Sequence, residues 1–231
     1  MSTKKEFWSK LVGEDWYLLF PEFWESSYMT NLLKLLSQRY KQATVFPEQK
    51  DIFKAFKLCR VKNFKVLILG QDPYPDGSAT GLAFANKDKI KLSPSLQKMY
   101  ETIERDCYDG LKIVFDESLE TWAEQGVLLL NTALTIEKFK TTSHSEYWKV
   151  FTKSFLKRLS ESHLTGIHVC LWGNHAKSFK PYLNDKTMYI YEALHPASAS
   201  YNNIDWECNH FKEINVKIVK QNNDLNDIIA W

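Results

Sequence analysis

The sequence has few cysteines, no long apolar run and almost no excess of charge. Its four cysteines, at positions 59, 107, 170 and 208, are far apart and form no C-x-x-C pair. This spacing argues against a zinc or iron–sulfur site and favours reduced thiols. No apolar stretch approaches the roughly 20 residues that cross a membrane, and the N-terminus lacks the apolar segment of a secretory signal. We therefore expect a cytoplasmic protein that binds neither metal nor membrane.

The charge balance excludes little by itself. The 30 basic and 28 acidic residues give a formal charge of +2, so nucleic acid would bind only if the basic residues gather on one face. The chain also contains no P-loop, no G-x-G-x-x-G and no G-x-S-x-G motif, which leaves a nucleotide hydrolase of another kind without support. Without repeats, linkers or low-complexity stretches, residues 1–231 are predicted to form one domain.

Four short apolar runs stand out against this background, at 66–69, 126–130, 167–171 and 188–191. Near-continuous apolar runs are typical of parallel strands buried on both faces. Segments with helical periodicity lie around them, at 28–40, 51–58, 94–106, 118–125, 146–160, 175–182 and 209–220. Alternation of strands and helices predicts an α/β fold, a three-layer α/β/α sandwich around a central four-stranded parallel sheet. Ser93 and Pro94 are a suitable N-cap and first residue for one of these helices.

Polar residues follow each apolar run directly. Asp72, Asn131, Asn174 and His195 come after the four runs in turn. Parallel strands would deliver all four to one edge of the sheet, where ligands bind in open α/β folds. Two prolines within three residues stiffen the segment that carries Asp72. The pattern predicts a catalytic crevice but does not name a substrate.

Five short motifs occur in order along the chain: Gly70-Gln71-Asp72-Pro73-Tyr74, Gly81-Leu82-Ala83-Phe84, Leu128-Leu129-Leu130-Asn131-Thr132, Leu171-Trp172-Gly173 and Leu194-His195-Pro196. In order and spacing this set resembles family 1 uracil-DNA glycosylases, and the agreement runs from about Val45 to Asn215. Pro94-Ser95-Leu96 and Ser143-His144 fit the same pattern. Any single motif is weak evidence, whereas the ordered set is highly specific.

The resemblance implies hydrolysis of the N-glycosidic bond between uracil and deoxyribose in DNA, without metal or other cofactor. This reaction builds positive charge on the sugar and negative charge on the departing base, so it needs an anion and a hydrogen-bond donor. By resemblance, Asp72 is the anion that positions the attacking water, and His195 is the donor at uracil O2. Taken alone, Asp72 is equally consistent with a capping carboxylate and His195 with a structural histidine.

A flipped uracil needs a pocket that recognises it. By resemblance, Phe84 stacks on the base, Asn131 reads N3–H and O4 with its amide, and Tyr74 excludes the methyl group of thymine. Gln71 would contact the base through its backbone. The alternatives are core packing for Phe84 and Tyr74 and a turn for Asn131.

The predicted DNA contacts are Ser95, Ser198, Ala199, Ser200 and Tyr201. Ser95 and Ser200 resemble phosphate-binding serines, although serines that stabilise turns would look the same. A basic rim on the loop that carries Lys87, Lys89 and Lys91 would meet further phosphates, unless these lysines are simply solvated.

The chain departs from the family in two places. His195-Pro196-Ala197-Ser198-Ala199-Ser200 replaces the usual His-Pro-Ser-Pro-Leu-Ser, so Ala199 stands where a leucine fills the space left by the flipped base. Tyr201, two residues later, is the candidate substitute. Pro75 also stands where many members have histidine, in a loop one residue shorter.

The sequence thus predicts a monomeric uracil-DNA glycosylase of base-excision repair. Its expected partners are uracil-containing DNA, single- or double-stranded, and inhibitor proteins that mimic DNA. The alternative is a non-catalytic DNA-binding or polymerase-accessory protein on the same fold. The joint presence of Asp72, Asn131 and His195 argues against that alternative.

Overall fold

The computed structural model describes residues 3–87 and 92–231 and contains the predicted four-stranded parallel sheet. Its strands are β2 (Val66–Gly70), β3 (Val127–Asn131), β5 (Ile167–Trp172) and β6 (Met188–Ala193), in the order β3-β2-β5-β6. All residues of β2, β3 and β5 are buried, whereas β6 at the edge has a mixed pattern. The apolar runs therefore mark the strands, as buried parallel strands require.

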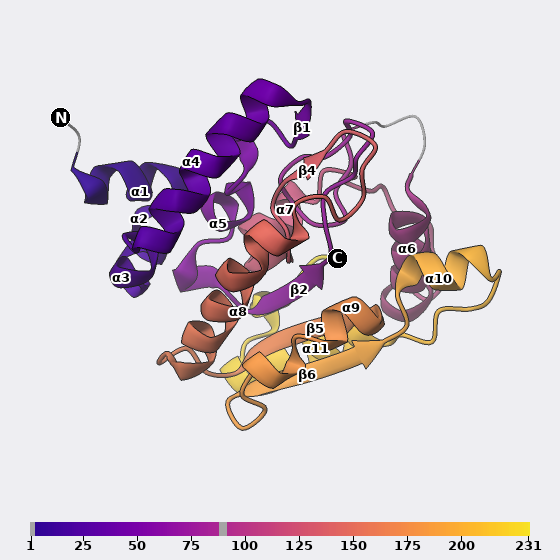
Figure 1. The fold of residues 1–231 in the computed structure, drawn as a ribbon. Helices are drawn as coiled ribbons and strands as arrows, with labels where there is room; N and C mark the ends of the chain where they lie inside the picture. The colour runs from indigo at the N-terminus through magenta and orange to yellow at the C-terminus, as the bar shows by residue number, and fades with distance from the viewer. Residues whose placement is uncertain (1–2, 88–91) are drawn as a thin grey trace.

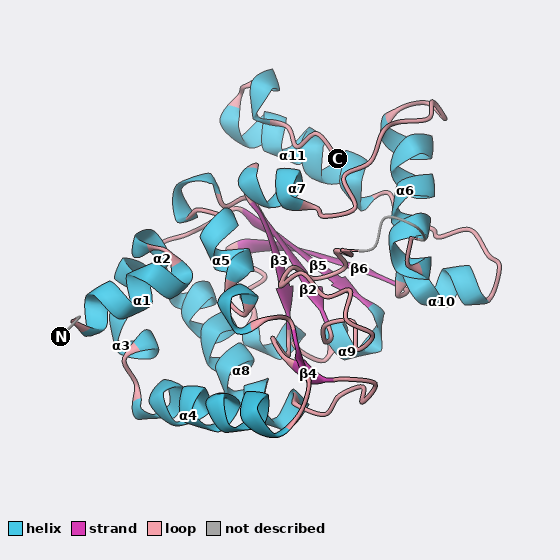
Figure 2. Cartoon of the chain, turned by 90° about the horizontal axis from the view of Figure 1, so that it is seen from above, coloured by secondary structure: helices cyan, strands magenta, loops and turns pink. Residues whose placement is uncertain are grey.

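Helices cover both faces of this sheet. Figure 2 shows α8 (Ser145–Glu161) and α9 (Gly173–Lys177) on one face, and α7 (Glu120–Glu124) and α11 (His210–Asn222) on the other. The α/β class and the three-layer arrangement are thus confirmed. A separate two-stranded antiparallel sheet pairs β1 (Val45–Phe46) with β4 (Ile136–Glu137).

Two of the remaining helices were predicted at nearly their observed bounds. These are α4 (Ser27–Gln42) and α6 (Pro94–Cys107), and in α6 the Oγ of Ser93 accepts a hydrogen bond from the Leu96 N–H, as expected for an N-cap. Three helices are shorter than predicted, namely α5 (Lys54–Leu58), α7 and α9. After α9 the chain forms a separate 3₁₀ turn at Lys180–Tyr182, because the proline within it cannot donate the hydrogen bond that would continue an α-helix.

The helices before residue 27 were not predicted. They are α1 (Lys4–Val12), α2 (Glu14–Leu19) and α3 (Pro21–Trp24), and they pack beside α4 and α5 (Figure 1). Their aromatic side chains join the core: Trp16 and Trp24 are completely buried, and the Trp16 indole donates to the Cys59 carbonyl at 2.6 Å. Such short helices depend on tertiary packing rather than on their own propensity.

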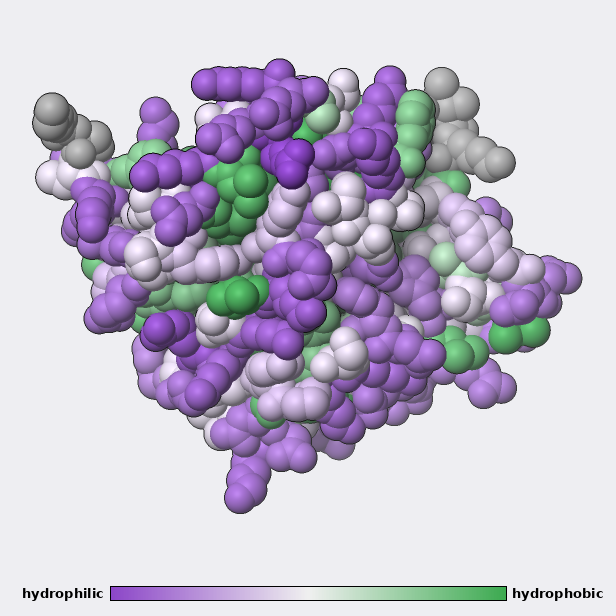
Figure 3. All heavy atoms as spheres, viewed as in Figure 1, coloured by the Kyte–Doolittle hydropathy of each residue, from purple (hydrophilic) through white to green (hydrophobic). Residues whose placement is uncertain are grey.

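The face of the molecule seen in Figure 3 is largely hydrophilic. In the view of Figure 3, apolar residues form small separate patches among polar ones. No helix in the described part of the chain is long and apolar enough to cross a membrane. Scattered apolar residues of this kind are normal for a folded surface.

Candidate active site

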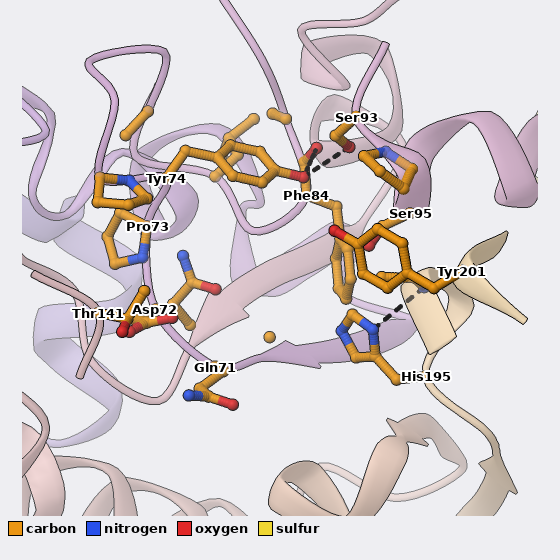
Figure 4. Close-up of a pocket in the computed structure, with 18 residues that line it drawn as sticks. Gln71, Asp72, Pro73, Tyr74, Phe84, Ser93, Ser95, Thr141, His195 and Tyr201 are labelled. Carbon is orange, nitrogen blue, oxygen red and sulfur yellow. Dashed lines mark hydrogen bonds between the residues drawn. The ribbon is translucent and has the colours of Figure 1, made fainter. Parts of the chain in front are cut away.

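A cavity of about 470 Å³ opens where β2, β3 and β6 end at one edge of the sheet. Six residues predicted to act on the base or the sugar line it together: Gln71, Asp72, Tyr74, Phe84, Asn131 and His195. Figure 4 shows Tyr74, Phe84 and His195 around a common space, with Ser95 and Tyr201 beside them. The convergence expected from parallel strands is therefore present.

Asn131 is the last residue of β3 and lies opposite Gly70 of β2 in the parallel ladder. Its side chain occupies the space beside that glycine, because a Cβ on Gly70 would lie 2.2 Å from Asn131 Oδ1. The residue is only 7% exposed, yet its amide hydrogen-bonds to no side chain or backbone group in the described structure. The polar atoms of this amide are not fully buried, so they face the cavity and are available to a ligand there.

Phe84 lies in the left-handed region, with a φ of 67°. A bulky residue rarely adopts this conformation, and such strain concentrates at functional sites. The ring centre lies 5.8 Å from that of Trp172 and 5.9 Å from that of His195, and the residue is 8% exposed. Phe84 is thus fixed by core packing on one side and lines the cavity on the other.

Tyr74 is held in place by its hydroxyl group. This hydroxyl donates to Ser93 Oγ at 2.7 Å and lies 3.4 Å from the Phe84 carbonyl oxygen. Burial raises the pKa of Tyr74, so the phenol stays protonated and neutral. The N-cap of α6 therefore also positions the tyrosine ring at the cavity wall.

Asp72 is half-buried at the end of the stiff segment that follows β2. Its Oδ2 accepts a hydrogen bond from the Thr142 N–H at 2.7 Å, while Oδ1 has no partner in the described chain. Burial raises the pKa of Asp72, and the Thr142 N–H and the nearby His175 partly oppose that rise. One carboxylate oxygen is thus fixed and the other is open to water or substrate.

His195 is the N-cap of α10 (Pro196–Tyr201), and its Nδ1 accepts a hydrogen bond from the Ala197 N–H at 3.2 Å. With Nδ1 as acceptor, the proton of the neutral ring is on Nε2, which becomes a donor. Burial lowers the pKa of His195 and so favours the neutral ring. Gly173 makes room for this histidine, because a Cβ there would lie 2.8 Å from His195 Cβ.

The pair formed by Thr132 and His175 was not predicted. Thr132 Oγ1 donates to the Gln71 carbonyl at 2.7 Å and lies 2.7 Å from His175 Nε2. A hydroxyl has a single proton, so His175 Nε2 must be the donor in the second contact. This chain of hydrogen bonds supports the segment that carries Asp72. The only indication of the Thr132–His175 pair in the sequence was the position of His175 just after a strand.

The residues predicted to contact DNA differ in their burial and in the hollow that they line. Ser95 is buried in the first turn of α6 and lines the cavity, as does the 76% exposed Tyr201. Ser198 lines a neighbouring hollow, and Ser200 is half-buried. Ala199 is completely buried, because residues 196–201 form the helix α10 and not the expected loop.

Of the three lysines predicted to form a basic rim, only Lys87 lies within the described residues. Lys87 lies 3.8 Å from Glu48, and Lys89 and Lys91 fall outside the described residues. Within residues 3–87 and 92–231, no group of three or more His, Cys, Asp or Glu side chains is placed to hold a metal ion.

Comparison with known proteins finds related sequences that match most of the chain. The model of the uracil DNA glycosylase superfamily matches residues 56–218. The uracil-DNA glycosylase of Fusobacterium nucleatum is 40% identical over 206 residues, which cover 88% of this chain and 90% of that protein. The enzyme of Clostridioides difficile is 41% identical over 206 residues, covering 88% of this chain and 91% of its own.

Solved structures show the same fold. The crystal structure of mimivirus uracil-DNA glycosylase gives a TM-score of 0.80 at 24% identity, over 94% of this chain and 86% of that one. A variant of the mimivirus protein in complex with UGI also gives 0.80, at 23% identity, over 93% and 87% of the two chains.

Proposed function

The chain belongs to the uracil DNA glycosylase superfamily and is an enzyme that excises uracil from DNA, and from this premise we propose that Asp72 and His195 are its catalytic residues. The observation that carries the proposal is their convergence with Phe84 and Asn131 around one cavity at the end of the sheet. Each of the four has a free face toward that cavity.

The cavity wall provides groups for recognising a flipped uracil. Phe84 offers an aromatic face, and the unpartnered amide of Asn131 offers both a donor and an acceptor to N3–H and O4. Tyr74, fixed by Ser93, would occupy the space that the methyl group of thymine requires. Gln71 would contact the base through its backbone, which the Thr132 hydroxyl holds in place.

The two catalytic groups would act on opposite ends of the breaking bond. Ionised Asp72, fixed through Oδ2, would stabilise the positive sugar and position a water molecule with Oδ1. The water would add its oxygen to the sugar carbon and give up one proton to the Asp72 carboxylate. The electrons of the N-glycosidic bond would leave with uracil as an anion, which solvent protonates after release. The Nε2–H of neutral His195 would donate to O2 of the uracil anion.

The same edge of the sheet would bind DNA. Ser95, Ser198 and Ser200 are candidates for phosphate contacts, and Tyr201 is exposed enough to fill the space left by the flipped base. The buried Ala199 would not reach DNA in this conformation. A DNA-mimicking inhibitor protein would use this surface too, as supported by the mimivirus complex with UGI. We also propose that the chain acts as a single-domain monomer.

Single-turnover release of uracil from an oligonucleotide tests the catalytic assignment. Asp72→Asn and His195→Ala should each slow release by about 10²–10³-fold, the usual cost of removing one electrostatic interaction with a transition state. Asp76→Asn is the matched control, because Asp76 is an exposed aspartate of the same segment. A near wild-type rate in either catalytic variant would show that its role is wrongly assigned.

A further inference from the structure

A second polar hollow lies next to the active cavity, on the α8 face of the sheet. We call it the lysine groove and define it by Lys149, Lys153, His175, Ser178 and Tyr182, which line a volume of about 360 Å³. The lysines come from α8, and the other three residues follow β5. The two lysines supply the free donors, because Ser178 Oγ donates to the His175 carbonyl and His175 Nε2 donates to Thr132. None of the catalytic residues proposed above lines this groove.

A smaller hollow of about 250 Å³ lies between the lysine groove and the active cavity. It shares Gln71 and His195 with the active cavity and His175 with the lysine groove, and Asn174 and Ser198 also line it. The three hollows are therefore neighbours, in the order active cavity, smaller hollow and lysine groove.

The charges of the lysine groove are suited to an anion. Lys149 pairs with Glu146 at 3.1 Å. This glutamate also lines the groove, but its side chain is 80% exposed, so the contact is weak and solvent-screened. Lys153 pairs with no carboxylate in the described parts of the chain, and its Nζ lies 5.1 Å from the centre of the Tyr182 ring. An ammonium group without a counter-charge beside an aromatic ring is typical of surfaces that follow a nucleic-acid strand.

We propose that the lysine groove binds a backbone phosphate of the uracil-containing strand, beyond the nucleotides that contact the active cavity. This rests on the proposed placement of uracil in that cavity. The groove is lined by α8 and by residues that follow β5. The helices α6 and α10, in contrast, project from the edge of the sheet (Figure 2). Duplex DNA is too stiff to turn from the edge onto the α8 face within a few base pairs. The ligand is therefore a single-stranded segment.

The test compares Lys149→Ala/Lys153→Ala with wild type on single-stranded oligonucleotides that carry one uracil and increasing flanks. On long strands the double variant should raise KM, and the slope of log KM against log salt should fall by about 0.7 for each phosphate that the variant no longer binds. On strands too short to reach the groove, KM should be unchanged. Lys149→Arg/Lys153→Arg should restore the slope.

Lys157→Ala is the matched control, because Lys157 is an exposed lysine of the same helix that lies outside the groove. A methylphosphonate at one flanking position, which removes one phosphate charge, should weaken wild-type binding and leave the double variant unaffected. A salt slope equal to that of wild type on every strand length would overturn the proposal. So would inhibition by inorganic phosphate through these lysines without any dependence on strand length, since the groove would then bind a free anion.

The two proposals fail in different ways. If uracil does not occupy the cavity, Asp72→Asn would keep its single-turnover rate at saturating substrate. If only the lysine groove is wrongly assigned, Asp72→Asn would be slow as expected and the long-strand KM of the lysine variant would match that of wild type.

Discussion

Asn131, Asp72 and His195 are each fixed by the protein through one side and open on the other. Asn131 packs against Gly70, Asp72 accepts from Thr142 and His195 accepts from its own helix. The remaining polar atoms are suited to the reaction: the Asn131 amide can bind the base, Asp72 Oδ1 can position water, and His195 Nε2–H can donate to uracil O2. Preorganisation of this kind lowers the barrier because little rearrangement is left for the moment of reaction.

His175 should act as a positioning residue for Asp72. In its cationic form it lowers the pKa of Asp72, and through Thr132 it supports the Gln71 carbonyl. His175→Gln removes the titratable charge and keeps an N–H donor, so the pKa of Asp72 should rise. Since Asp72 acts as a carboxylate, the acid limb of kcat/KM should then move to higher pH, as a pH–rate profile would show.

His175→Leu removes the donor as well. The loss of one hydrogen bond, about 0.5–1.5 kcal/mol, should lower kcat by roughly two- to tenfold beyond the effect of His175→Gln. If both variants gave the wild-type profile and rate, the hydrogen bond with Thr132 would have no part in supporting Asp72.

Residues that follow strands directly were predictable from the sequence. Asp72, Asn131 and His195 come at the ends of apolar runs, and the run itself indicates where they will lie. The contacts of His175 with Thr132 and of Thr142 with Asp72 were not predictable, because they join residues 43 and 70 positions apart. Only the packing of strands and loops brings these pairs together.

Among the secondary-structure elements, the helix α10 differs most from what the sequence predicted. By resemblance, Ala199 stands at the position of the leucine that fills the space left by the flipped base. Ala199 is instead completely buried, so a leucine should overpack this site and cost about 1–3 kcal/mol of unfolding free energy. A lower thermal midpoint without a gain in duplex activity is the expected result; higher duplex activity at unchanged stability would contradict it.

Tyr201 is the residue of α10 that should matter for duplex DNA. Its side chain is 76% exposed, so Tyr201→Ala should leave stability unchanged while removing stacking worth about 1–3 kcal/mol. The ratio of single- to double-stranded uracil release in single turnover should therefore increase. Tyr201→Phe keeps the ring and serves as the control. Equal ratios in the wild type and Tyr201→Ala would exclude a wedge at this position.

Elements with a strong periodic pattern were predicted best. Helices α4, α6, α8 and α11 were found from regularly spaced apolar residues, and the four strands from short, near-continuous apolar runs. The short helices α1–α3 and α10 were not predicted. Their formation depends on contacts that are distant in sequence.

At the scale of the whole molecule, the histidines should make stability depend on pH. Burial lowers the pKa of five of the six: His144, His168, His175, His195 and His210. In the unfolded chain these residues titrate near pH 6.5. Below that pH the unfolded state binds more protons than the folded state, so the free energy of unfolding should fall as pH falls.

Urea denaturation at pH 7.5 and 5.5, at constant ionic strength, measures this effect. The midpoint should be lower at pH 5.5, and His168→Gln should reduce the difference, because His168 is held neutral between Tyr191 and Gln221. His163→Gln is the control, since His163 is exposed to solvent. Equal midpoints at the two pH values would contradict the prediction.

The contact between Gly70 and Asn131 ties base recognition to the alignment of β2 with the edge strand β3. If β2 and β3 slipped by one residue, an apolar side chain would face Gly70 and the amide would point to the opposite face of the sheet. Such a chain could not recognise any base. A one-residue error in strand alignment would therefore give an inactive enzyme and not one of altered specificity.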